Sequence, residues 1–256
     1  MSNLQQIRAA FASQAEGFAQ PGQAISDPNH LNWMLAALDL HPGIQAVDVA
    51  AGTGLLSMAL VPYVRRVLAL DATPEMLQQG MRKTGQAELA NITFVLGLAQ
   101  ALPVATDAFD RVVCRFAIHH FPDPATAVYE MTRACAIGGQ VVLIDLVSPN
   151  DGPLAQSYNH LERLRDPSHV RAQTLPELEA LLLQSGLRLR PSASRVIQVK
   201  VDRWLGLANT DDTTARGICE VLVAELTESK VTGMRPFMGP DGLYFHQTWA
   251  IAVGQK

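Results

Sequence analysis

One stretch of the chain, residues 46–56, constrains the fold most, because it has the pattern of a buried strand, a glycine turn and a helix. It reads Ala-Val-Asp-Val-Ala-Ala-Gly-Thr-Gly-Leu-Leu. Val47 and Val49 are apolar and β-branched, they flank one acid, Asp48, and the turn pair Pro42-Gly43 precedes them, which predicts a short central strand. A carboxylate on such a strand is costly to bury without a partner. We therefore expect Asp48 to be paired.

The turn after this strand has the composition of a ligand-binding loop. Gly52 and Gly54 allow positive φ and carry no Cβ, so a ligand can approach the backbone closely at the end of the strand, where open α/β sheets bind their ligands. The helix expected from Leu55 directs its free N–H groups to the same place. The next predicted strand, residues 66–71, ends in Asp71, an acid placed to hold two ribose hydroxyls. The turn and the acid together predict a nucleoside site.

A nicotinamide dinucleotide site is an alternative interpretation of this turn. The dinucleotide fingerprint needs a third small residue at a fixed spacing, and counting from Gly52 that position holds Ser57. No third glycine follows, so the spacing matches a nicotinamide oxidoreductase only in part. We keep that enzyme class as the less favoured hypothesis.

Several motifs follow one another along the chain. Val-Asp-Val-Ala-Ala-Gly-Thr-Gly comes first, Ala-Leu-Asp-Ala-Thr-Pro-Glu-Met-Leu second and Phe-Val-Leu-Gly-Leu-Ala-Gln-Ala-Leu-Pro third. Phe109–Arg115, His119-His120-Phe121 and Ala136–Gly139 come after them. In these motifs and their order the sequence resembles the class I methyltransferases that use S-adenosylmethionine, and within them the branch that includes ubiquinone and menaquinone biosynthesis methyltransferases. The resemblance covers most of the chain.

The resemblance implies an α/β fold of the Rossmann-like, doubly wound kind. We expect a mostly parallel seven-stranded sheet with helices on both faces, an antiparallel last strand and an N-terminal helical lid. A single domain would span residues 1–256, with the lid in 1–40, the cofactor-binding core in 41–147, and substrate-side inserts with the last two strands in 148–256.

Apolar spacing and turn residues place the individual elements. Apolar residues at helical spacing predict an amphipathic helix over 4–19, ended by Pro21-Gly22, which either packs on the core or closes over the cofactor and substrate. A second helix is expected over 28–40, and a later one over 122–137 that stops at Gly138-Gly139. Further strands are expected over 93–96, 111–116, 140–146, 187–201 and 243–253.

The resemblance also implies roles for residues around the glycine turn. Asp48 and the carbonyls near it suit the ammonium group of S-adenosylmethionine, Gly52 and Gly54 let the methionine tail lie against the backbone, and Asp71 takes the ribose diol. The product would be S-adenosylhomocysteine. The predicted cofactor-binding residues are Asp48, Ala50, Gly52, Gly54, Asp71, Ala72, Met76, Leu98, Ala99, Gln100 and Arg115.

Two of these positions depart from the family pattern. Leu98 stands where the family usually has an acid for the adenine amino group, so adenine recognition must come from backbone near Ala99, from Gln100 or from water. Ala50 replaces a common glycine, and we expect little consequence because alanine is small. Met76 either packs in the core or flanks the adenine, since a thioether suits both places.

Adjacent histidines follow the predicted strand over 111–116, in a loop that faces the methyl group in this fold. A neutral imidazole of His119 or His120 can take a proton from a hydroxyl or an amine near pH 7. The competing interpretation is structural hydrogen bonding, and the two histidines are not separable from sequence. Arg115 interrupts an apolar strand and needs a partner, and we expect Asp145 to be a capped or paired acid.

Asn159, Glu162, Arg163 and the run Arg165–His169 resemble a signature of this methyltransferase branch. They either form the rim of the substrate pocket or make an ion-pair cluster on the surface. The insert before the last strand contains aromatic residues and methionines, which fit an apolar, aromatic or polyketide-like small molecule but also suit a plain core. These residues are Trp204, Met234, Phe237 and Met238.

Composition excludes several function classes. The net charge of −4 disfavours a nucleic acid substrate, which needs clustered Lys and Arg. Cys114, Cys135 and Cys219 are far apart and lack metal-ligand spacing, so we expect reduced thiols and no metal. With no apolar signal core at the N-terminus and no long uncharged run, we expect a cytoplasmic protein with no membrane partner, as a monomer or homodimer.

The sequence therefore predicts an enzyme that transfers a methyl group from S-adenosylmethionine to a small, apolar or aromatic molecule. Whether oxygen, nitrogen or carbon accepts the methyl group is left open. The alternative is a protein that binds S-adenosylmethionine without methyl transfer, or that catalyses another reaction with the bound cofactor.

Overall fold

The computed structural model describes residues 3–14, 24–227 and 231–256. The strands are β1 Gln45–Val49, β2 Arg66–Asp71, β3 Ile92–Leu96, β4 Phe109–Arg115, β5 Cys135–Val147, β6 Arg188–Lys200, β7 Pro236–Gly239 and β8 Gly242–Gln255. The α-helices are α1 Asn3–Gln14, α2 Pro28–Ala36, α3 Leu55–Leu60, α4 Pro74–Gln86, α5 Pro124–Ala134, α6 Gly152–Arg165, α7 Leu175–Gln184, α8 Val201–Leu207 and α9 Asp212–Thr227. Short 3-10 helices are η2 Ala24–Ser26, η3 Val61–Tyr63 and η4 Ile118–His120.

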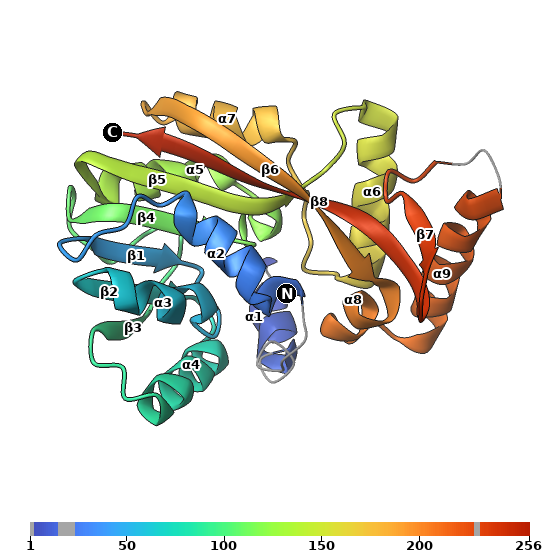
Figure 1. The fold of residues 1–256 in the computed structure, drawn as a ribbon, viewed down its shortest axis with the longest axis horizontal. Coiled ribbons are helices and arrows are strands. Elements are labelled where there is room, and N and C mark those ends of the chain that lie inside the picture. The colour runs from blue at the N-terminus through green and yellow to red at the C-terminus, as the bar shows by residue number, and fades with distance from the viewer. Residues whose placement is uncertain (1–2, 15–23, 228–230) are drawn as a thin grey trace.

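In this part of the chain the strands form one mixed sheet with helices around it (Figure 1). The strand order is β3-β2-β1-β4-β5-β8-β6. The first five of these strands run parallel, and β8 lies antiparallel between β5 and β6. The predicted fold class, mostly parallel with an antiparallel last strand, is confirmed. The carboxyl ends of β1, β2 and β4 therefore meet at one edge of the sheet, the place where such folds bind ligands.

Alternation of apolar side chains along the central strands builds two cores, one on each face of the sheet. In β4 and β5, Val113 and Val142 pack in one cluster, whereas Val112 and Val141 pack in the other, and all four are fully buried. Successive side chains of a strand point to opposite faces, so one apolar run supplies both clusters. A strand buried on both faces needs such a run, which is why the Val-rich segments formed the parallel centre.

The sheet has one strand more than the seven that we expected. The additional strand is β7, which pairs antiparallel with β8 and places Gly239 opposite Gly242. It is short and begins with Pro236, which has no N–H to donate but is tolerated at the first residue of a strand. The strand was not predicted from the sequence because it has only four residues and begins with a proline.

The helix predicted over 122–137 ends earlier, at Ala134. The Ala134 carbonyl accepts a hydrogen bond from the Ala108 N–H at 2.9 Å, and Cys135 is in register with Phe109. Because the neighbouring strand satisfies these backbone groups, the chain leaves the helix three residues before the expected end and begins β5.

The N-terminal helices also differ from their predicted bounds. The described part of α1 ends at Gln14, and the predicted continuation over 15–19 with the stop at Pro21-Gly22 lies outside the described residues. α2 begins after Asp27, whose carboxylate accepts from the Asn29 N–H, and it ends four residues before the expected position. Across the described ranges, no helix has the length and apolar character needed to cross a membrane.

The long strand β8 connects the sheet to a second group of elements. Figure 1 shows it running from the sheet to the side where α6, α8, α9 and β7 gather. Trp204 of α8 and Phe245 of β8 pack there with ring centroids 5.0 Å apart, and both are buried. A pair of buried aromatic rings therefore lies beyond the carboxyl ends of the parallel strands.

Candidate active site

A cavity of about 1250 Å³ opens where β1, β2 and β4 end. One part of its lining comes from the glycine turn and from the loops after β2 and β3. Another part comes from the C-terminal half of the chain, through Trp204, Gln247 and Trp249. Ile7 and Phe11 of α1 also lie on it. The cavity therefore joins the predicted nucleoside site to the aromatic residues beside β8.

Most of the predicted site residues lie on this cavity. The residues that line it are Ala50, Gly52, Asp71, Ala72, Met76, Leu98, Ala99, Gln100, Arg115, His119 and His120. Asp48 and Gly54 are not part of the lining. The structure thus brings eleven of the thirteen predicted residues together on one surface and places the other two behind it.

Asp71 lies at the end of β2 and connects the strand to the glycine turn. Its Oδ2 accepts a hydrogen bond from the Gly52 N–H at 2.8 Å, and its Oδ1 accepts from the Thr73 N–H at 2.8 Å. Burial raises the pKa of Asp71, while the backbone hydrogen bonds oppose that shift. Each carboxylate oxygen has a second lone pair, so the group can still accept from a ligand in the cavity.

Asp48 lies beneath the turn. The Ser57 hydroxyl donates to its Oδ2 at 2.6 Å, whereas its Oδ1 is buried without a hydrogen-bond partner. Burial raises the pKa of Asp48 to about 6, and the Ser57 hydrogen bond and the Arg115 charge act against that rise. Ser57 is thus the partner that we expected for this acid. Direct contact between Asp48 and a cofactor ammonium stays a prediction, because other residues form the cavity wall in front of it.

Arg115, the charged interruption at the end of β4, has partners from the N-terminal segment. Its guanidinium donates to the Ile25 carbonyl, lies 3.3 Å from Met34 Sδ through Nε, and is 4.7 Å from the centroid of the Phe116 ring. Burial lowers the pKa of Arg115 to about 10, and the charge of Asp48 acts in the opposite direction. Arg115 therefore ties η2 and α2 to the floor of the cavity.

Ala50 adopts the left-handed conformation, with φ of 57°. The sequence predicted little consequence for alanine at this position, and that prediction is wrong, because the backbone there favours glycine. A left-handed conformation costs an L-residue roughly 1–2 kcal/mol.

Replacing Ala50 with Gly is expected to stabilise the protein by about 0.5–1 kcal/mol, since the relief of strain exceeds the extra chain entropy of glycine. The midpoint of urea unfolding measures this change. Ala51→Gly is the matched control, because Ala51 is not among the described residues with positive φ, and it is expected to destabilise the protein. Equal destabilisation by both variants would contradict the strain at Ala50.

Three buried histidines gather beside the end of β4. The ring centroids of His119 and His120 are 4.0 Å apart, and those of His119 and His169 are 5.3 Å apart. His119 pairs through Nδ1 with Asp145 Oδ1 at 2.6 Å, as expected for a paired acid at the end of a strand. Among the residues that the structure describes, no group of three His, Cys, Asp or Glu side chains is arranged to hold a metal ion.

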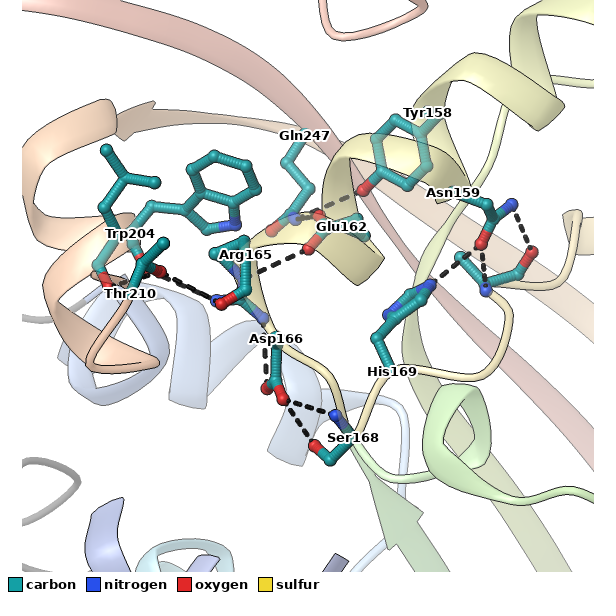
Figure 2. A network of polar contacts seen from close by, with 12 residues as sticks. Tyr158, Asn159, Glu162, Arg165, Asp166, Ser168, His169, Trp204, Thr210 and Gln247 are labelled. Atoms are coloured by element: carbon teal, nitrogen blue, oxygen red, sulfur yellow. Dashed lines mark hydrogen bonds and ion pairs between the residues drawn. The ribbon is translucent and has the colours of Figure 1, made fainter. Parts of the chain in front are cut away.

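A polar network extends from α6 into the loop that follows it (Figure 2). Glu162 is fully buried, accepts a hydrogen bond from Gln247 Nε2 at 3.1 Å and pairs with Arg165 at 3.4 Å. Arg165 also lies 3.5 Å from Asp166, and it donates to the Trp204 carbonyl at 3.4 Å. Glu162, Arg165 and Asp166 all have less than a tenth of their surface exposed. The interpretation of this signature as a surface ion-pair cluster is therefore wrong for Glu162, Arg165 and Asp166, whereas Arg163 is exposed. Arg165 and Asp166 line the cavity.

Comparison with known proteins gives this geometry a family. The methyltransferase domain profile matches residues 47–143, which include the glycine turn and both carboxylates beside it. YcgJ from Bacillus subtilis, named as an uncharacterized methyltransferase, is 32% identical over 200 residues, covering 78% of this chain and 79% of YcgJ. The crystal structure of YcgJ matches with a TM-score of 0.81 at 28% identity, over 90% of this chain and 99% of that one. A demethylmenaquinone methyltransferase from Renibacterium salmoninarum is 28% identical over 223 residues, covering 86% of this chain and 90% of the relative.

The chain belongs to the S-adenosylmethionine-dependent methyltransferases. This family implies S-adenosylmethionine as the cofactor, and the residues at the cavity fit such a group. In this methyltransferase a Cβ built on Gly52 would meet only Met76 Sδ, at 4.0 Å, so the glycine leaves open space on the cavity side of the turn. Asp71 lies next to that space with acceptor capacity for hydroxyl groups. Gly52 would hold the amino acid part of the cofactor and Asp71 its ribose.

The two glycines of the turn serve different purposes in the methyltransferase. Gly54 has φ of 76°, and a Cβ there would approach the Phe94 ring to 3.0 Å, away from the cavity lining. Gly52→Ala is expected to weaken S-adenosylhomocysteine binding at least tenfold, because the added methyl group occupies the open space beside the cavity. Gly52 also has a positive φ, of 57°, so this variant is expected to lose roughly 1–2 kcal/mol of unfolding free energy as well. Gly54→Ala is expected to lower the unfolding free energy by about 1–3 kcal/mol through strain and overpacking. Calorimetry and urea unfolding of both variants separate the effects, and a Gly52→Ala protein with wild-type affinity would contradict the binding role of Gly52.

The part of the methyltransferase cavity where we expect adenine has no acid in the place of Leu98. Leu98, Ala99 and Gln100 all line the cavity there, and Met76 is buried on it. The Leu98 carbonyl accepts from the Ala101 N–H at 3.1 Å, which closes the loop locally. Recognition of adenine by the backbone near Ala99 or by Gln100 stays a prediction.

Several residues that shape the site of this methyltransferase were not predicted from the sequence. Gln247 and Trp249 lie two residues apart on β8, and the Trp249 Nε1–H donates to Gln247 Oε1 at 2.8 Å. Phe116 packs against Trp249 with ring centroids 4.6 Å apart. Gln247 and Trp249 are two residues apart, so both lie on one face of the strand. This spacing is the only local feature of the sequence from which their common position could have been predicted.

Proposed function

We propose that this methyltransferase transfers the methyl group of S-adenosylmethionine to a small apolar or aromatic molecule. The observation that carries the proposal is the size and reach of the cavity. A site for one drug-sized ligand occupies roughly 300–1,000 Å³, whereas this cavity measures about 1250 Å³ and extends to Phe116, Trp204 and Trp249. That extent supports a second molecule beside the cofactor.

The sulfonium of the cofactor supplies a methyl group that is already activated. The protein must therefore bring the acceptor close to it, orient it and exclude water. Aromatic walls suit a flat, apolar acceptor, and the buried polar groups of Arg165, Asp166 and Gln247 offer hydrogen bonds to polar substituents. Relatives named demethylmenaquinone methyltransferase support this class of acceptor.

The proposal assigns a different role to each of three parts of the chain. Residues 1–40 act as a lid, 41–147 hold the cofactor and 148–256 hold the acceptor. The positions of Ile7 and Phe11 on the cavity support the first assignment, and those of Trp204 and Gln247 support the last. A small-molecule partner, no nucleic acid and a monomeric or dimeric cytoplasmic protein complete it, in keeping with the net charge of −4.

Transfer of a labelled methyl group tests the proposal. The protein is incubated with S-adenosylmethionine labelled in its methyl group and with a small-molecule extract, and the products are separated by chromatography. We expect label in an apolar product. Binding of S-adenosylhomocysteine by calorimetry with no transfer to any acceptor would favour the alternative, a protein that binds the cofactor without methyl transfer.

A further inference from the structure

His119 differs from the other two buried histidines because its ring is hydrogen-bonded to a carboxylate, that of Asp145. Its Nδ1 lies 2.6 Å from Asp145 Oδ1, and its backbone N–H donates to Asp145 Oδ2 at 3.1 Å. The Leu146 N–H also donates to Oδ1, at 2.8 Å. An ionised carboxylate only accepts, so this geometry assigns the ring proton to Nδ1. The lone pair of His119 is then on Nε2, on a side chain that lines the cavity.

His120 and His169 lack this arrangement. His120 Nδ1 faces the Ser168 carbonyl at 3.0 Å, and burial together with the charge of His119 lowers the pKa of His120 to about 3. His169 donates through Nε2 to Asn159 Oδ1 at 2.8 Å and is not part of the cavity lining. Burial lowers the pKa of His169 strongly, and the neighbouring histidines add to that effect. Neither ring is placed to take up a second proton at neutral pH.

We propose that His119 is the general base of this enzyme, that Asp145 is its positioning residue, and that the acceptor is an aromatic hydroxyl compound. This inference rests on the proposed function. A base is needed only where the accepting atom carries a proton, and a phenol is such an acceptor. The Phe116 and Trp249 rings lie edge to face 4.6 Å apart and line the same cavity, which suits an aromatic ring.

The hydroxyl proton of the acceptor moves to Nε2 of His119, and the oxygen forms its new bond to the methyl carbon. The bond between that carbon and the cofactor sulfur breaks, and its electron pair stays on sulfur, which becomes a neutral thioether. Asp145 stabilises the imidazolium of His119, which returns the proton to water after the product leaves.

The titratable groups around the His119 ring come from β5, η4 and the loop after α6. Asp145 of β5 is the acid that faces its ring, while His120 of η4 and His169 of the loop after α6 are the neighbouring bases. Asp166 and Arg165 act on His120 with opposite signs. An imidazolium at His119 would therefore have one carboxylate, that of Asp145, and two neutral imidazole rings as neighbours.

Ionisation of a bound phenol tests the proposal without turnover. 4-Nitrophenol is titrated into the complex of protein and S-adenosylhomocysteine, and its phenolate absorbance is followed with pH. We expect the apparent pKa of the bound phenol to fall by about one unit, which is tenfold in the ionised fraction. His119→Gln abolishes this fall and Asp145→Asn reduces it. His160→Gln, at an exposed histidine of α6, is the matched control and retains it. An unshifted wild-type titration, or no binding of the phenol, overturns the inference.

Methyl transfer gives a second readout. On weakly acidic phenols such as 4-methylphenol, His119→Gln is expected to lose about 10²- to 10⁴-fold in rate, and less on 4-nitrophenol at alkaline pH, where the acceptor is already ionised. Equal losses on both phenols point to a structural role and overturn the inference. Retained S-adenosylhomocysteine binding shows that the variant is folded. Label that enters an extract but none of the phenols refutes this inference and leaves the proposed function standing, whereas no transfer to any acceptor refutes the proposed function.

Discussion

Replacing Asp71 with Asn is expected to weaken S-adenosylhomocysteine binding by about 100-fold. The carboxylate lies on the cavity beside the open space at Gly52, where it can accept from two ribose hydroxyls. Hydrogen bonds to a charged group contribute about 1.5–3 kcal/mol each, and about 1.4 kcal/mol corresponds to a factor of ten in affinity. Asn keeps the shape of the side chain but has one acceptor oxygen and no charge, so it cannot hold both hydroxyls.

Asp71 has a second role that limits the choice of variant. Its carboxylate also accepts from the Gly52 and Thr73 N–H groups, so Asp71→Ala would leave both of these donors without their partner and would destabilise the fold. The Asn variant is expected to lose about 1–2 kcal/mol of unfolding free energy. Calorimetry measures the affinity, with Asp212→Asn at an exposed position outside the cavity as the control. Wild-type affinity in the Asp71→Asn protein would contradict the ribose assignment.

Replacing Glu162 with Ala is expected to lower the free energy of unfolding by about 3–5 kcal/mol, the range measured when one partner of a buried ion pair is removed. Glu162 is fully buried, faces Arg165 at 3.4 Å and accepts from Gln247 at 3.1 Å. Without it, Arg165 keeps one carboxylate neighbour, Asp166 at 3.5 Å. The buried guanidinium at the cavity wall then has one of its two carboxylate partners left.

Urea unfolding with the exposed Glu220→Ala as control measures this effect. Exposed substitutions usually change stability by about 0.5 kcal/mol or less, so the control is expected to unfold near the wild-type midpoint. Because Gln247 and Arg165 both line the cavity, the Glu162 variant is also expected to disturb the acceptor side more than cofactor binding. A stability change as small as that of the control would show that the network is not coupled to the fold.

The geometry of the glycine turn and of Asp71 could be predicted because its signals are local. The glycine turn and the acid that ends the next strand are short patterns whose positions follow from the topology of a parallel sheet. The structure places Gly52 and Asp71 within one hydrogen bond of each other. The prediction missed the strain at Ala50, because no pattern in the sequence states which φ a turn residue adopts.

The proposed acceptor side could not be predicted to the same depth because its contacts are distant along the chain. His119 and His120 are neighbours in sequence, and what separates them is Asp145, 26 positions away, which pairs with one ring and not the other. Gln247 donates to Glu162 from 85 positions further along the chain. This contact is part of a buried network, where the sequence alone allowed a charge cluster on the surface. Such pairings depend on how β5, β8 and α6 pack, and no spacing rule contains them.

The crystal structure of the protein with S-adenosylhomocysteine tests the central claim most directly. We expect the ribose hydroxyls within hydrogen-bonding distance of the Asp71 carboxylate and the amino acid part of the ligand against the backbone of Gly52, with the sulfur facing the space in front of Phe116 and Trp249. A nucleoside bound elsewhere, or one that lies in this cavity without touching Asp71, would contradict the account.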